Sequence, residues 1–72
     1  MTDKKAIAYI VFIVSEFAKE HSLSLNNAFS YLAEYGAIRF LDENYDAEHL
    51  LSTDEVVEDM YAISRRNGGV LV

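Results

Sequence analysis

The chain has 72 residues, of which 51% are hydrophobic, and a formal net charge of −6 at neutral pH. Because it contains no cysteine, disulfides and thiolate metal sites are excluded. The excess of acids over bases argues against nucleic-acid binding, since that binding depends on lysine and arginine side chains that neutralise phosphates.

Nine consecutive apolar residues, AIAYIVFIV, occupy positions 6–14. A helix that is apolar all round is buried on more than one side. No glycine or proline interrupts the following residues, and Thr2 or Asp3 can cap the start, which predicts a helix over residues 3–21. The run is too short to cross a membrane, which takes about 20 apolar residues. It also lacks the cleavage site of a secretory signal. We therefore expect a buried helix and a cytoplasmic protein.

A second helix is predicted over residues 25–35, with Ser24 as its N-cap. Gly36 stands where a left-handed residue would end this helix. A short helical piece is expected near residues 37–44, whereas residues 47–52 fit either a helix or an extended segment. The one-sided apolar pattern of the second helix comprises Leu25, Ala28, Phe29 and Leu32.

The last helix is predicted over residues 53–66, since Ser52 and Glu55 have the spacing of a capping box. The apolar tail, residues 70–72, is expected to dock on the core or on a partner subunit. The sequence thus predicts a single all-α domain, residues 1–72, built as a small bundle of three main helices plus a short helical piece. So small a chain has a marginal core of its own, and we expect a homodimer built partly on the first helix or on the tail.

The segment between Phe40 and Ser64 contains eight acidic residues and no lysine or arginine. Such a concentration of like charge works against the compact state through self-repulsion. It therefore favours water, a metal ion or a basic protein partner as its neighbour. The acids are Asp42, Glu43, Asp46, Glu48, Asp54, Glu55, Glu58 and Asp59.

A metal site in this segment is one alternative. Asp42, Asn44 and Asp46 match the first three ligand positions of a calcium-binding loop. However, Ala47 stands where that loop needs glycine, and Thr53 where it needs glutamate. On a continuous helix His49 would share a face with the two aspartates, which leaves a small zinc or manganese site as the less favoured reading.

No pattern indicates an enzyme or a bound cofactor. The sequence has no glycine-rich phosphate loop, no serine in a nucleophile elbow and no partners for a catalytic His21 or His49. His21 fits a charge at a helix C-terminus, and His49 fits a structural hydrogen bond. A helix-turn-helix around Gly36 is also disfavoured, because Arg39 is the only base of its second helix.

One group of residues precedes the last helix. We expect Tyr45, Asp46 and His49 to form a clasp between the short helical piece and the last helix, through aromatic packing and a hydrogen bond between Asp46 and His49. The alternative is that His49 belongs to a functional site.

The second half of the chain resembles an uncharacterised bacterial family known as domain of unknown function 3791. The resemblance is carried by Tyr35-Gly36, by Tyr45-Asp46-x-x-His49, by Val57-Glu58-Asp59 and by the arginine-rich end of the last helix. Members of that family are short, acidic and helical, and are often encoded beside proteins similar to ADP-ribosyltransferase toxins. The resemblance implies a neutralising, antitoxin-like or other partner-binding role.

These observations lead to one functional expectation. The chain is predicted to be a non-enzymatic interaction module that binds a basic protein through its acidic helical face, with tyrosines as apolar anchors. The alternative is a self-associating structural homodimer. The residues expected to contact the partner are Tyr45, Asp46, His49, Asp54, Glu55, Glu58, Asp59 and Tyr61.

Overall fold

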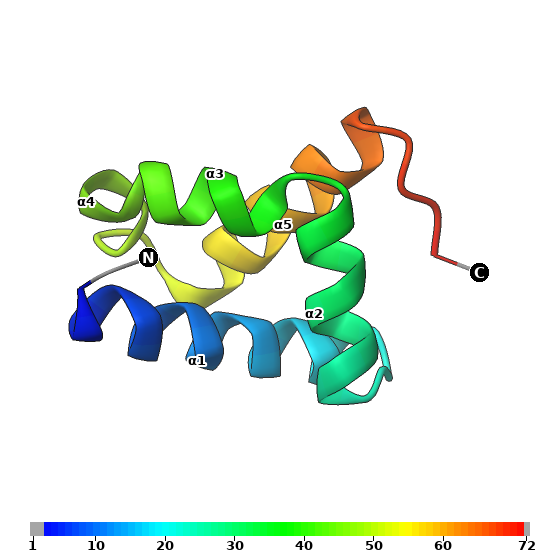
Figure 1. The fold of residues 1–72 in the computed structure, drawn as a ribbon, viewed down its shortest axis with the longest axis horizontal. Coiled ribbons are helices and arrows are strands. Elements are labelled where there is room, and N and C mark those ends of the chain that lie inside the picture. The colour runs from blue at the N-terminus through cyan, green and yellow to red at the C-terminus, as the bar shows by residue number, and fades with distance from the viewer. Residues whose placement is uncertain (1–2, 72) are drawn as a thin grey trace.

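The computed structural model describes residues 3–71, which form five helices and no strand (Figure 1). This confirms the all-α bundle of three main helices and a short helical piece. The segment left open by the sequence, residues 47–52, contains the end of one further short helix and a turn. The helices are α1 (Lys4–Glu20), α2 (Leu25–Glu34), α3 (Ala37–Glu43), α4 (Tyr45–Glu48) and α5 (Thr53–Arg66).

Side-chain caps start the three longer helices at the predicted residues. Asp3, Ser24 and Ser52 each accept a hydrogen bond from a backbone N–H of the following turn. Ser52 and Glu55 also complete the capping box, in which each side chain bonds the backbone of the other residue. Gly36 has a left-handed φ of 83°, which ends α2 and turns the chain into α3.

The end of α1 uses a residue that the sequence did not mark. Ser22 adopts a left-handed φ of 56°. The Leu23 N–H then donates to the Ala18 carbonyl at 2.9 Å, as in a Schellman motif. Gly68, with φ 93°, plays the same part at the end of α5, where glycine carries no steric penalty.

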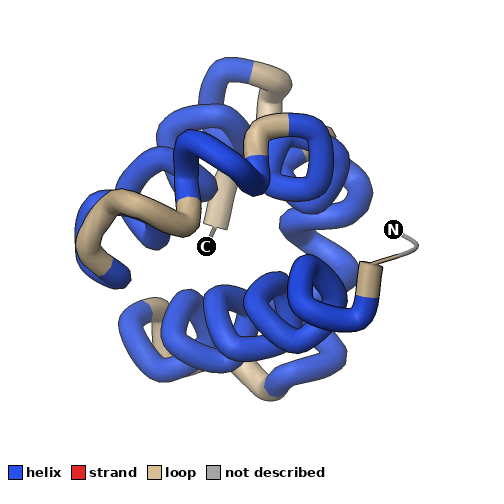
Figure 2. Tube along the Cα trace, turned by 90° about the vertical axis from the view of Figure 1, so that its left-hand side faces the viewer, coloured by secondary structure: helices blue, strands red, loops and turns tan. Residues whose placement is uncertain are grey.

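The helices enclose one apolar core. α1, α3 and α5 pack against one another, α2 crosses one end of them, and α4 lies at the other end beside the start of α1 (Figure 1). Short loops alone join them (Figure 2). The largest fully buried side chains of this core are Phe17, Ile10, Ile13, Leu32, Leu41 and Met60.

Within the single chain, α1 is buried on one side only, which corrects the expectation that its apolar run is buried on more than one. Ile10, Ile13 and Phe17 face the core and are at most 1% exposed. Val11 and Phe12, on the outer side, are 54% and 46% exposed. The four other helices together cover one face of α1, because they all lie on the same side of it (Figures 1 and 2).

The C-terminal tail docks on the core, as predicted, through its backbone and one side chain. The Tyr31 hydroxyl donates to the Gly69 carbonyl at 2.9 Å, and Leu71 packs against the core. Val70 is 69% exposed, so the tail is buried at alternate residues. Val72, part of the predicted docking segment, lies outside the described residues.

The close approach of Gly69 to α2 and α5 generates a prediction. A Cβ atom at this position would lie 2.7 Å from Tyr35 Cδ2 and 2.9 Å from the Ser64 carbonyl oxygen. We expect Gly69→Ala to lower the free energy of unfolding by about 1–3 kcal/mol through overpacking. Val70→Ala, at the exposed neighbouring position, is the control and should change it by less than about 0.5 kcal/mol. Urea unfolding measures both, and equal stabilities would contradict the close packing of the tail.

Candidate functional site

A cleft of about 610 Å³ opens between the C-terminal half of α1 and the first half of α5. It brings together acidic residues that are far apart in the sequence, with Lys19 as the one lysine or arginine of its lining. Such a concentration of carboxylates attracts cationic groups. The four acids, hereafter the cleft acids, are Glu16, Glu20, Asp54 and Glu58.

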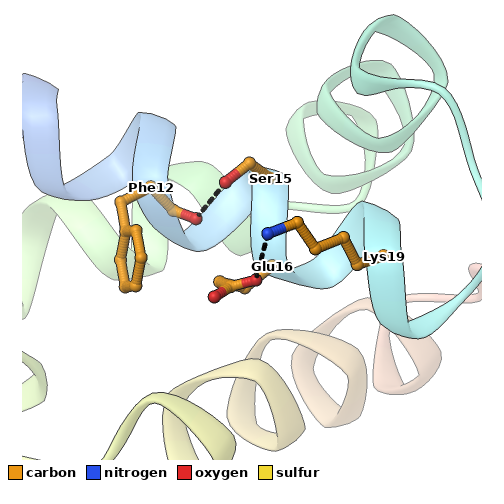
Figure 3. Close-up of polar contacts among 4 residues, drawn as sticks. All are labelled: Phe12, Ser15, Glu16 and Lys19. Atoms are coloured by element: carbon orange, nitrogen blue, oxygen red, sulfur yellow. Dashed lines mark hydrogen bonds and ion pairs between the residues drawn. The ribbon is translucent and has the colours of Figure 1, made fainter.

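Lys19 forms an ion pair with one of the cleft acids, Glu16, and this pair is weak. Its Nζ lies 3.3 Å from a Glu16 carboxylate oxygen, and both side chains lie on the α5 side of α1 (Figure 3). The lysine side chain is 76% exposed, so the pair is solvated and contributes little to stability. Lys19 is therefore free to exchange Glu16 for another partner at low energetic cost.

Aromatic rings form one wall of the cleft. The His21 ring lies 4.3 Å from the Phe17 ring and 4.7 Å from the Tyr61 ring, measured between centroids. The Arg65 guanidinium lies 5.6 Å from the Tyr61 centroid, and its Nη1 donates to the Tyr61 hydroxyl at 3.2 Å. The Tyr61 ring thus already holds one cation, in the geometry of a cation–π contact.

A second group of acidic residues, Glu48, Glu55 and Asp59, brings α4 and α5 together, and Glu48 is its buried member. Glu48, at the end of α4, is only 7% exposed, and no donor within residues 3–71 reaches its Oε1. Burial, followed by a hydrogen bond to Asp59 and the charges of Asp59 and Glu55, raises the pKa of Glu48 from 4.5 to about 7. A protonated Glu48 can donate a hydrogen bond to Asp59, and in this neutral form it does not repel the Asp59 carboxylate.

The main-chain carbonyl of Glu48 also takes part in the contact between α4 and α1, which is otherwise aromatic. The Tyr9 hydroxyl donates to the Glu48 main-chain carbonyl at 3.2 Å. The Tyr9 ring meets the Tyr45 ring edge-on at 5.5 Å, and Tyr45 stacks on His49 at 4.6 Å. Burial, with smaller contributions from Glu48 and Tyr45, raises the pKa of Tyr9, which keeps it a neutral donor. These contacts fasten α4 to the start of α1.

The predicted clasp is therefore present with different partners. Its aromatic packing joins α4 to α1 through Tyr9, where the sequence suggested the last helix. His49 Nδ1 lies 2.7 Å from the Tyr45 carbonyl oxygen, and no hydrogen bond between His49 and Asp46 is formed in the described part of the chain. The helical turn of α4 brings the carbonyl four residues back to the ring, while Asp46 faces solvent.

The predicted partner-binding residues fall into three places. Asp54, Glu58 and Tyr61 line the cleft. Glu55 is engaged in the capping box of α5, and Asp59 faces Glu48. The others lie on α4 or directly after it, namely Tyr45, Asp46 and His49.

Sequence reasoning missed the half of the cleft contributed by α1 and the burial of Glu48. Glu16 and Glu20 belong to the helix that was read as an apolar core element, and no local signal places them opposite α5. The spacing of Asp54, Glu58 and Tyr61, which puts them on one face of α5, was the signal available for the other wall.

Two further observations concern the metal site and the membrane-spanning helix that were considered for this sequence. Within residues 3–71 no group of three or more histidine, aspartate or glutamate side chains is arranged to hold a metal ion. Asp42, Asp46 and His49 therefore do not form the site that a continuous helix would give. In the same range, no helix combines the length and apolar character needed to cross a bilayer.

Comparison with protein families identifies relatives of this chain. The family described as a protein of unknown function (DUF3791) matches residues 8–64. The chain belongs to this family. The match runs from α1 into α5, so it includes both walls of the cleft and the whole of α4. Comparisons with curated proteins and with solved structures gave no match.

The buried carboxyl of Glu48 predicts a pH-dependent stability for this DUF3791 member. Because its pKa rises from 4.5 to about 7 on folding, the folded state binds more protons than the unfolded state between these values. The wild type should therefore lose stability relative to Glu48→Gln as the pH rises from 4.5 to about 7, by as much as about 3 kcal/mol.

Chemical unfolding across this pH range measures the difference. Glu58→Gln removes an exposed acid of α5 and controls for the change in net charge. Parallel stability curves for the wild type and Glu48→Gln would show that Glu48 is ionised in the folded protein, contrary to the prediction.

Proposed function

We propose that the chain is a non-enzymatic interaction module that binds a basic segment of a partner protein in the cleft between α1 and α5. The observation that carries the proposal is the convergence of four carboxylates, from two helices, on one cleft of about 610 Å³. The cleft accommodates whole side chains, which favours a peptide segment over a single ion.

Arginine and lysine side chains fit this cleft for two physical reasons. Carboxylates accept charge-assisted hydrogen bonds from guanidinium and ammonium groups, and arginine makes two such bonds to one carboxylate. The Tyr61 ring in the lining already contacts the Arg65 guanidinium, and it offers an incoming side chain aromatic packing surface. Part of the lining is apolar, since Val57 of the core borders the cleft, and the methylene stem of an incoming side chain can pack there.

The proposed outcome of binding is neutralisation or regulation of the partner in the cytoplasm. An acidic module of this kind can cover a cleft whose arginines and lysines bind a phosphate-rich cofactor. The resemblance to a family whose members are often encoded beside ADP-ribosyltransferase-like proteins agrees with such an antitoxin-like role. Mutual repulsion among the cleft acids is relieved when a basic segment enters, which adds to the driving force for association.

A triple variant of the cleft tests the proposal. Glu20→Gln, Asp54→Asn and Glu58→Gln together remove three carboxylates from both walls of the cleft and leave Glu16 and its lysine partner in place. We expect the wild type to bind a short arginine-rich peptide, and the triple variant to bind at least about tenfold more weakly. Calorimetry and NMR shift mapping measure the affinity and the location, and raised salt should weaken binding.

A matched variant separates the cleft from general charge. Glu34→Gln, Glu43→Gln and Asp46→Asn remove the same number of charges from exposed positions outside the cleft. This variant should bind like the wild type. Equal weakening in both variants would mean that the net charge, and not the cleft, attracts the peptide. In the source cell, a partner inhibited by the wild type and not by the cleft variant would establish the neutralising role.

A further inference from the structure

The outer face of α1 carries an apolar stripe that the rest of the described chain leaves uncovered. Ile7, Val11 and Phe12 are 40%, 54% and 46% exposed, and the small Ala8 lies among them. These four residues are the α1 stripe. α1 lies along the lower side of the molecule in Figures 1 and 2, with its outer face directed away from the other helices. Adjacent exposed apolar side chains of this kind mark an interaction surface.

We propose that a second copy of the chain covers this surface, with the two α1 helices packed antiparallel about a two-fold axis. In such an arrangement the same surface serves both subunits, so it must be complementary to itself. The centre of the α1 stripe meets this requirement because it is apolar throughout and because Ala8 allows the two helices to approach closely.

Two polar residues adjoin the α1 stripe, and neither opposes its burial. Lys4, at the start of α1, can keep its ammonium group in water. The Ser15 hydroxyl donates to the Phe12 carbonyl at 2.7 Å, within its own helix (Figure 3). Since the hydroxyl already has an acceptor, covering it with another helix leaves no buried donor without a partner. The surface therefore loses little hydrogen bonding when it leaves water.

The charges at the two ends of the α1 stripe select the antiparallel orientation. Lys5 and Glu16 are separated by eleven residues, about three helical turns, so they lie on the same edge of α1. A two-fold axis near the middle of the stripe places Lys5 of each copy beside Glu16 of the other. A parallel two-fold pair would place the Lys5–Glu16 edges of the two copies on opposite sides of the interface, where these charges could not pair. Opposite charges across an interface fix its register and orientation.

The area of the α1 stripe determines how tight a dimer is expected. A standard interface buries about 800 Å² on each partner, roughly a sixth of the 4725 Å² surface of this chain. The α1 stripe with its flanking charges offers less than a standard interface, because it spans only about three turns of one helix. We therefore expect a dimer that dissociates in the micromolar range.

Sedimentation equilibrium across a concentration series, from micromolar to millimolar, tests the proposal. The wild-type mass should rise from 8.2 kDa toward twice that value. Val11→Glu with Phe12→Gln should remain monomeric. Phe29→Gln is the matched control, because Phe29 lies on α2 and is 45% exposed, close to the value for Phe12. It should dimerise like the wild type, and circular dichroism verifies that every variant folds.

A charge exchange tests the orientation. Lys5→Glu should weaken the dimer, and adding Glu16→Lys to it should restore the dimer. A wild type that stays monomeric throughout the series, or a dimer that survives the stripe variant, would overturn the proposal. So would a monomeric wild type whose stripe binds lipid vesicles or another protein. The proposal goes beyond the cleft, since Val11, Phe12 and Lys5 lie outside the cleft lining and Glu16 is the one residue that the two proposals share.

Discussion

The packing of Phe17 is the contact on which the rest of the structure depends. Its side chain is fully buried, and its ring lies against Tyr31 of α2 and Tyr61 of α5 at centroid distances of 5.9 and 6.3 Å. One residue of α1 therefore fixes the positions of two other helices. The same ring supports His21, which stands in the wall of the cleft. Phe17 thus sets the relative position of α1 and α5 in the core, and the acidic cleft lies between the same two helices at the surface.

The acidic residues of the second half serve different physical purposes, although the sequence presents them as one run. Glu55 caps α5, where its carboxylate satisfies a backbone N–H and favours the helix dipole. Burial, together with the nearby Asp59, raises the pKa of Glu48, which favours its neutral form. Asp54 and Glu58 are exposed and line the cleft. Of these acids, Asp54 and Glu58 are the two that line the cleft in which a cation is proposed to bind.

Much of the fold could be predicted from the sequence, because local chemistry determines where the helices begin and end. Ser24, Ser52 and Gly36 act as the caps and stops that their residue types indicate. The apolar period alone could not show which side of residues 6–14 faces the core, since that run has no polar side. Half of the cleft escaped prediction for a related reason. Glu16 meets Asp54 and Glu58 only through tertiary packing, which leaves no mark in local spacing.

The two proposed surfaces are neighbours, and their geometry links them. Glu16 lies at the border between the cleft and the outer face of α1. In the antiparallel pair, the two-fold axis sets Lys5 of each copy beside Glu16 of the other. The edge of α1 that carries these two residues then lies on the same side of the dimer in both copies. The two acidic clefts then open on that side. A partner with two basic segments could occupy both clefts at once, and the second contact would form at a high effective concentration. Two modest surfaces on a small chain can in this way give tight binding that neither provides alone.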